Sequence, residues 1–113
     1  MERYIAKAVF LIETPDQKEP GQFEEVLRLV EADTRRAAFD KAVAWGRLES
    51  TEFANMRGER VAWKFVAVSE LKRLPELVDG LELDSHLQKV GAEDEFIRLQ
   101  LDKQRDILQQ QPA

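Results

Sequence analysis

The chain begins with an apolar run, Tyr4–Glu13, and this run constrains the fold more than any other feature of the sequence. Both of its alternating faces are apolar, which is typical of a β-strand covered on both sides. A membrane span needs about 20 apolar residues, so the run is too short to be one. It contains Lys7 and lacks the small-residue cleavage site of a signal peptide. We therefore expect a buried strand in a cytoplasmic protein.

A second strand is predicted over Phe23–Glu31. The segment between the two strands, Thr14–Gly21, holds two prolines and a glycine among charged residues, which indicates an exposed loop. The two strands can then form an antiparallel hairpin. Alternation divides the second strand into two faces, with Phe23, Leu27 and Leu29 on one and Val26, Arg28 and Val30 on the other.

A helix is predicted over Arg35–Glu52, with Asp33 or Thr34 as its N-cap. Small and aromatic side chains recur at helical spacing along one side of it. The members of this side are Ala38, Ala42 and Trp45, with Gly46 beside them. A glycine inside a helix costs about 1 kcal/mol relative to alanine, so we expect Gly46 to permit a close approach of the helix to a sheet.

The second half of the chain is predicted to contain a central strand, Arg60–Val68. Its faces are expected to be Val61, Trp63, Phe65 and Ala67 on one side and Ala62, Lys64, Val66 and Val68 on the other, with Trp63 and Phe65 in the core under the helix. The remaining predicted elements are a short partner strand Glu52–Met56, a turn Asn55–Gly58, one helical turn Ser69–Leu74, a half-buried strand Leu81–Leu87 and a helix Ala92–Gln109.

These elements follow one another as β-β-α-β-β-β-α. Such an order favours an α+β fold with a mainly antiparallel sheet, one helix on a face of the sheet and a C-terminal helix. A chain of 113 residues is long enough to bury a core without disulfides or metals. We expect a core domain over residues 1–91 and a C-terminal helix with a polar tail over residues 92–113.

Several kinds of chemistry are excluded or disfavoured. The chain has no cysteine, which excludes disulfides, thiolate metal sites and cysteine nucleophiles. It contains neither a phosphate-binding glycine loop nor a Gly-x-Ser-x-Gly elbow. Its net charge is −5, and its lysines and arginines are interspersed with acids, so we expect no nucleic-acid partner and no membrane partner.

The lone histidine, His86, alternates with Asp84 and Glu82. A metal or general-base role is one interpretation of this pattern, and an exposed polar strand face is the other. Asp79–Glu82 lacks the alternating oxygen ligands of a calcium loop. We therefore assign no catalytic, cofactor-binding or metal-binding residue and expect no cofactor.

The sequence holds more apolar surface than one helix can cover. We expect the second face of the sheet to carry some combination of Ile5, Val9, Leu11, Val26, Val30, Val66 and Val68. The candidate interaction surface lies on the C-terminal helix, where Ile97, Leu101 and Leu108 form a stripe flanked by Phe96. This helix can fold back on its own sheet, meet a second copy, or exchange between protomers.

Several segments, taken in their order along the chain, resemble the family called domain of unknown function 4288. This family is a group of short and mostly bacterial proteins. The segments that carry the resemblance are Tyr4–Val9, Phe23–Val30, the helix with Ala38, Ala42 and Gly46, Gly58–Val66, and Asp79–Glu82. The resemblance covers about Tyr4 to Ser85 and leaves the C-terminal helix out. It implies no activity, because none is assigned to the family.

We accordingly predict a non-catalytic protein-interaction or oligomerisation module that forms a homodimer or binds a protein partner. One alternative is a small enzyme whose site forms at a dimer interface. Another is an inhibitor of a partner protein, similar to immunity proteins and antitoxins.

Overall fold

The computed structural model describes residues 1–15 and 21–110. The chain divides into two units, Met1–Leu83 and Asp84–Ala113, and we describe each by itself. Most of the predicted loop Thr14–Gly21 and the end of the polar tail lie outside the described residues.

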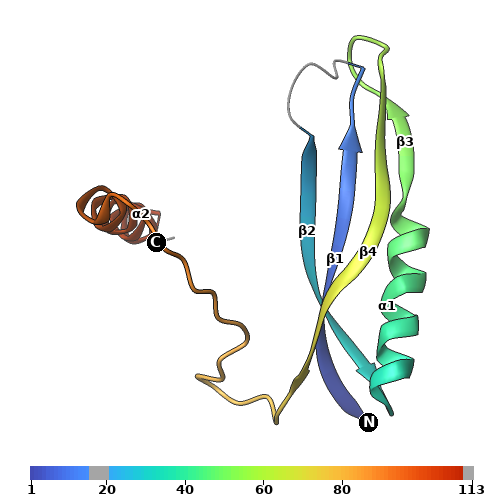
Figure 1. Ribbon diagram of the computed structural model, residues 1–113, viewed down its shortest axis with the longest axis horizontal. Helices are drawn as coiled ribbons and strands as arrows, with labels where there is room; N and C mark the ends of the chain where they lie inside the picture. Colours follow the sequence, from blue (N-terminus) through green and yellow to red (C-terminus); the bar gives the residue numbers. More distant parts are fainter. Residues whose placement is uncertain (16–20, 111–113) are drawn as a thin grey trace. The chain divides into compact units, whose positions relative to one another are not determined.

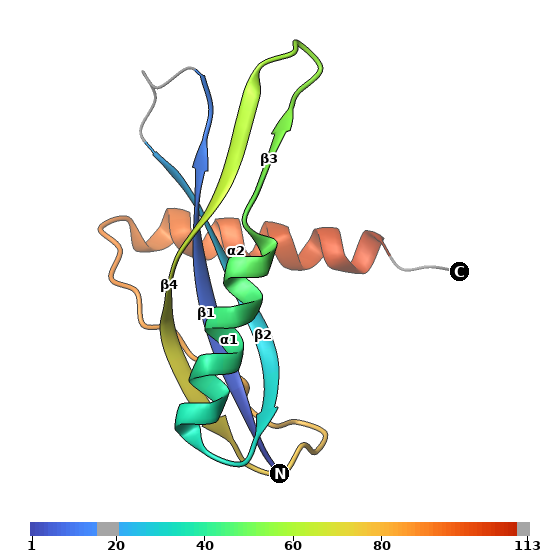
Figure 2. The ribbon, with the colours of Figure 1, turned by 90° about the vertical axis from the view of Figure 1, so that its right-hand side faces the viewer.

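The first unit is a four-stranded antiparallel sheet with one helix packed on a face (Figures 1 and 2). Its elements are β1 (Glu2–Glu13), β2 (Gln22–Ala32), α1 (Arg35–Glu49), β3 (Thr51–Ala54) and β4 (Arg60–Leu74). The strand order is β2-β1-β4-β3, so β1 and β4 are the central strands. The predicted α+β class, the antiparallel sheet and the central position of the fourth strand are confirmed.

The β1–β2 hairpin is regular along its whole length. Its register runs without a break from Glu2 opposite Ala32 to Ile12 opposite Gln22. Residues directly opposite each other in an antiparallel pair share a face of the sheet. Tyr4 and Ala6 of β1 therefore lie on the same face as Val30, and these three side chains are buried in one cluster.

The β1–β4 pairing is longer than predicted and contains two irregularities. It reaches from Glu13 opposite Ala62 to Arg3 opposite Leu74, so the predicted helical turn Ser69–Leu74 is wrong. The backbone of β1 offers partners along this whole stretch, and such pairing overrides local helix propensity. Pro75 follows the last residue of the strand and lacks the N–H that continued pairing would need.

The two irregularities change which side chains of β4 point toward α1. Consecutive residues of β1 lie opposite Phe65 and Ala67 at the first irregularity, and opposite Val68 and Glu70 at the second. Val66 and Ser69 therefore have no opposite residue in β1. Each extra residue interrupts the strict alternation of faces. Val68 therefore lies on the same face as Phe65, packed against the buried cluster, which corrects the predicted division of this strand into two faces.

Helix α1 begins as predicted and ends earlier. The Thr34 hydroxyl accepts a hydrogen bond from the Ala37 N–H at 3.1 Å, which is an N-cap. The helix ends at Glu49 rather than Glu52, because the next residues join the sheet as β3. The Phe65 N–H donates to the Ser50 hydroxyl at 3.0 Å where the chain leaves the helix.

The core lies between α1 and the sheet. Ala38, Ala42 and Gly46 are the buried residues of α1, and a Cβ on Gly46 would lie 2.4 Å from the ring of Phe65. The predicted close approach at Gly46 and the position of Phe65 under the helix are confirmed. Trp63 and Phe65 are both half-buried. Trp63 stacks on Phe53, with ring centroids 5.5 Å apart, where β4 pairs with β3.

The predicted strand over Leu81–Leu87 is not formed. The chain from Pro75 to Gly91 contains turns and irregular segments, with Gly80 at a φ of 87°. Alternating side chains alone do not make a strand, and no strand among the described residues pairs with this segment. The C-terminal helix α2 (Glu93–Gln109) is confirmed, with three acids in its first turn. No helix among the described residues is long and apolar enough to cross a membrane.

Candidate functional site: a cleft, an ionic cluster and an uncovered sheet face

The candidate interaction surface on α2 is exposed within its own unit. Ile97, Leu101 and Leu108 are exposed, Phe96 is half-buried, and no residue of this helix is fully buried. At about 100° per residue, Ile97, Leu101 and Leu108 fall within a stripe of about 40°, and Phe96 lies about 100° around the helix from it. The surface therefore stays a prediction.

His86 lies in the irregular segment before α2 and is exposed, not on a strand face. In the part of the chain that the structure describes, no three His, Cys, Asp or Glu side chains are placed to hold a metal ion. Asp84 and Glu82 are exposed in the same irregular segment. Since this segment is not a strand, it does not hold His86, Asp84 and Glu82 on one face of a sheet.

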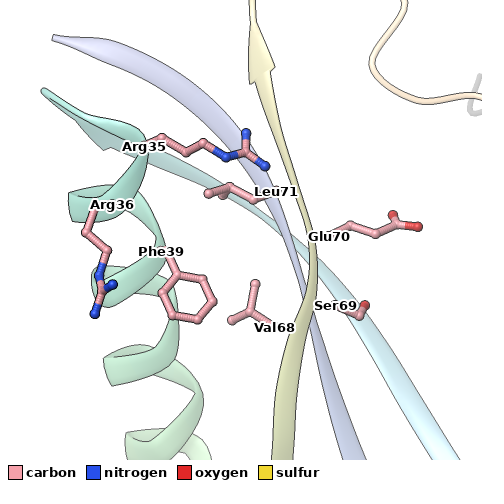
Figure 3. Close-up of a pocket in the computed structure, with 7 residues that line it drawn as sticks. All are labelled: Arg35, Arg36, Phe39, Val68, Ser69, Glu70 and Leu71. Carbon is pink, nitrogen blue, oxygen red and sulfur yellow. The ribbon is translucent and has the colours of Figure 1, made fainter.

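A cleft of about 550 Å³ lies between α1 and β4 (Figure 3). The Phe39 ring points toward Val68 there, and the Arg35 guanidinium extends past Leu71. The other residues that line it are Arg36, Ser69 and Glu70. Figure 3 shows the Glu70 side chain on the side of β4 away from α1, and Arg36 is paired with Asp40 at 3.0 Å. The cleft can hold an apolar group beside a guanidinium.

No local pattern in the sequence predicts this cleft. It exists because β3 begins only at Thr51, opposite Trp63, and pairs only with Arg60–Trp63, which leaves the rest of β4 without a strand on that side. The irregularity at Ser69 lies in the same stretch. Both features depend on pairing between strands, which local sequence patterns do not record.

An ionic cluster lies at the end of the sheet where β1 begins. The Tyr4 hydroxyl donates to Glu2 Oε2 at 2.8 Å, and Arg73 Nη2 pairs with Glu2 Oε1 at 2.8 Å. The hydrogen bond to Glu2 is the largest cause that raises the pKa of the Tyr4 phenol above its ordinary value of 10.0. Burial and the charge of Glu2 act in the same direction, while Arg73 and Arg35 lower it.

This shift predicts a measurable titration, because Tyr4 is the only tyrosine. A raised pKa means that folding favours the neutral phenol, so its contribution to stability is complete below pH 10 and is lost as the pH rises through the folded-state pKa. We expect tyrosinate absorbance to appear at higher pH in the folded protein than in the unfolded chain. Glu2→Gln should lower that midpoint, and Glu31→Gln, on the other face of the sheet, should leave it unchanged. Equal midpoints for wild type and Glu2→Gln would contradict the assignment.

The face of the sheet opposite α1, here called the open face, is not covered by any helix among the described residues of the first unit. The register places Ile5, Val9 and Leu11 on it, as predicted. Val26, Val30 and Val68 lie on the α1 face instead, which corrects that part of the prediction. The open face carries the other alternating set of β2, which is Phe23, Leu27 and Leu29.

The exposed apolar side chains of the open face are concentrated on β2. Phe23, Leu27 and Leu29 are 59%, 52% and 47% exposed. Their neighbours Ile5 and Leu11 on β1 are half-buried, and β1 has a neighbouring strand on each side. The β2 side chains have a neighbouring strand on one side only, since β2 is the edge of the sheet. We call these three residues and the outer backbone of β2 the β2 edge.

Comparison with known proteins supports the resemblance seen in the sequence. No curated protein and no solved structure matches the chain. One family model matches residues 3–85, a range that contains α1 and the whole sheet except its first residue, and ends before α2. The chain therefore belongs to the family described as Domain of unknown function (DUF4288).

Proposed function

We propose that this protein is a non-catalytic oligomerisation module that forms a homodimer through its β2 edge. The observation that carries the proposal is the row of exposed apolar side chains Phe23, Leu27 and Leu29 on a strand that lacks an outer neighbour. Exposed apolar patches of this kind mark interaction sites on soluble proteins. The chemistry of the cleft and of the ionic cluster offers no acid–base or nucleophilic pair that favours catalysis.

The area argument supports association of moderate strength. Fully burying a leucine or phenylalanine side chain contributes about 1.5–3 kcal/mol. A strand added at the β2 edge lies beside these side chains and covers one flank of each, so each contributes less than about 1 kcal/mol. The three side chains occur twice in a homodimer. Association itself costs about 4 kcal/mol or more, so the apolar term must be joined by backbone pairing and charge pairing.

We propose α2 as a second interaction surface, through Ile97, Leu101 and Leu108 with Phe96 beside them. Its apolar side chains are exposed within the unit that contains it, so a second copy or another protein can cover them. We propose that this association takes place in the bacterial cytoplasm, on the resemblance to a family of mostly bacterial proteins.

The molar mass in solution tests the proposal. Light scattering at micromolar concentration should give twice the 13.1 kDa of one chain. Leu27→Glu should weaken the dimer by at least about tenfold, or about 1.4 kcal/mol, because it places a charge in the apolar row. The matched control is Leu48→Glu, the same substitution at an exposed leucine on α1. A wild-type monomer, or equal weakening by both variants, would sink the proposal.

A further inference from the structure

We infer that the two copies join their sheets by pairing β2 with β2 antiparallel, in the register that places Val26 opposite the partner's Val26. This inference rests on the proposed homodimer and adds the antiparallel pairing of the two β2 strands and its register. Addition of an extended strand to a free sheet edge is a common mode of protein recognition, in which backbone hydrogen bonds supply affinity.

The two sides of the sheet differ in their fitness for such pairing. On one side, β3 has four residues, and the lower part of β4 contains the irregularities at Val66 and Ser69. Short strands and bulges are the features by which proteins prevent pairing at sheet edges. On the other side, β2 has eleven residues in unbroken register and contains no proline, glycine or lysine (Figure 1). The protection of the β2 edge is limited to its charged side chains, which are Glu24, Glu25, Arg28 and Glu31. It lacks the shortness, proline and bulges that also block pairing.

Symmetry restricts the register. An antiparallel pair of identical strands is related by a two-fold axis normal to the sheet, so both copies keep the same face on the same side. Opposite residues must then share a face, so the axis passes midway between one residue of the strand and the same residue of the partner. We call this residue the centre of the register. Near the middle of β2 the possible centres are Glu25, Val26, Leu27 and Arg28.

Charge decides against two of the four centres. A centre at Glu25 places this carboxylate opposite the partner's Glu25. A centre at Arg28 places this guanidinium opposite the partner's Arg28. Like charges directly opposite each other destabilise a strand pair.

The remaining two centres differ in how they pair apolar side chains. A centre at Leu27 places Phe23 opposite the partner's Glu31 and Leu29 opposite the partner's Glu25. A centre at Val26 places Phe23 opposite the partner's Leu29, and symmetry provides this pair twice. It also places Leu27 opposite the partner's Glu25, whereas a centre at Leu27 places Leu27 opposite the partner's Leu27. The comparison is therefore between two aromatic–aliphatic pairs and one leucine–leucine pair. Aromatic and aliphatic pairs contribute about 0.2–1 kcal/mol each, whereas an acid opposite an apolar ring contributes no such contact.

The Val26 centre also places Arg28 opposite the partner's Glu24, again twice. The Arg28 guanidinium pairs with Glu49 and lies 5.6 Å from the centre of the Trp45 ring, so its position is already held by α1. Glu24 is exposed on the same face of the sheet, two residues from Val26. The partner's carboxylate thus meets an ordered cation, which favours a second copy of this chain as the occupant of the β2 edge.

Single cysteines test the register, because the natural sequence has none. Residues directly opposite across an antiparallel pair have Cα atoms about 4.5–5.5 Å apart, within the range of a disulfide. We expect Val26→Cys to form a covalent dimer on mild oxidation, read on a non-reducing gel. Glu25→Cys and Leu27→Cys are the matched controls, since their sulfurs would be offset from the partner's by two residues. Diagonal neighbours are about 7–8 Å apart, beyond disulfide reach.

A mixture of two variants gives an independent readout. Phe23→Cys and Leu29→Cys should form a covalent dimer when mixed and neither should do so alone. Positions along an antiparallel pair alternate between hydrogen-bonded and non-hydrogen-bonded, and Val26 and Phe23 are three residues apart. One of the two cysteine pairs is therefore at a hydrogen-bonded position and the other at a non-hydrogen-bonded position, where the Cα atoms are closer. Circular dichroism would show that each variant is folded.

The outcomes separate this inference from the proposed homodimer. Cross-linking of Leu27→Cys or Glu25→Cys in preference to Val26→Cys would overturn the register. A wild-type dimer in which none of these variants cross-links would overturn the β2 pairing and leave self-association standing. A wild-type monomer would overturn both.

Discussion

Replacing Phe10 with alanine is expected to lower the free energy of unfolding by about 3–5 kcal/mol, the usual cost of removing a buried phenylalanine. Phe10 is 2% exposed and lies on the central strand β1. Its ring meets that of Phe65 edge to face, with centroids 5.8 Å apart. Domains of this size are stable by about 5–15 kcal/mol, so the loss is a large fraction of the total.

Urea denaturation at fixed protein concentration measures this effect. Fixed concentration matters because self-association stabilises the folded state by mass action. Phe53→Ala is the matched control, since Phe53 is 47% exposed and stacks on Trp63 at the edge of the sheet. We expect it to cost about 1 kcal/mol. Equal losses in the two variants would mean that the core is not where the structure places it.

Gly46→Ala is expected to destabilise the protein, against the direction that helix propensity alone would give. Propensity favours alanine by about 1 kcal/mol inside a helix. The new Cβ, however, would lie 2.4 Å from Cδ1 and Cε1 of Phe65, and Phe10 packs against that ring. Overpacking of this kind costs about 1–3 kcal/mol, so we expect a net loss of up to about 2 kcal/mol.

Two further variants separate the opposing effects. Ala44→Gly, at an exposed position two residues earlier in α1, measures propensity without the steric contact. Phe65→Leu should reduce the cost of Gly46→Ala when the two are combined in a double-mutant cycle. Stabilisation by Gly46→Ala in the wild-type background would show that α1 does not approach β4 as closely as described.

Local patterns in the sequence predicted the helices and strands that are determined by neighbouring residues. The Thr34 cap, the small residues of α1 and the alternation along β2 each act within a few residues. The hairpin, the helix and the close approach at Gly46 were therefore predictable. The end of α1 at Glu49 was not, because it depends on the pairing of Thr51–Ala54 with β4.

The errors share a cause in long-range pairing. Ser69–Leu74 has the composition of a helical turn, yet β1 extends it as a strand. The irregularity at Ser69 shifts the face on which Val68 lies, which no alternation rule could predict. The cleft beside Phe39 and the exposure of the β2 edge follow from the strand order, so they too depend on which strands meet.

The irregular outer side of β4 has a consequence for the size of the assembly. A sheet with two regular free sides can add copies without limit, and such growth leads to fibrils. Here only the β2 side is regular, while the other side combines a four-residue strand with two bulges. Once two β2 strands have paired, the joined sheet ends on both sides in the irregular β3–β4 border. In the proposed dimer, growth of the sheet through β2 would therefore end after a single step, with two copies in each joined sheet.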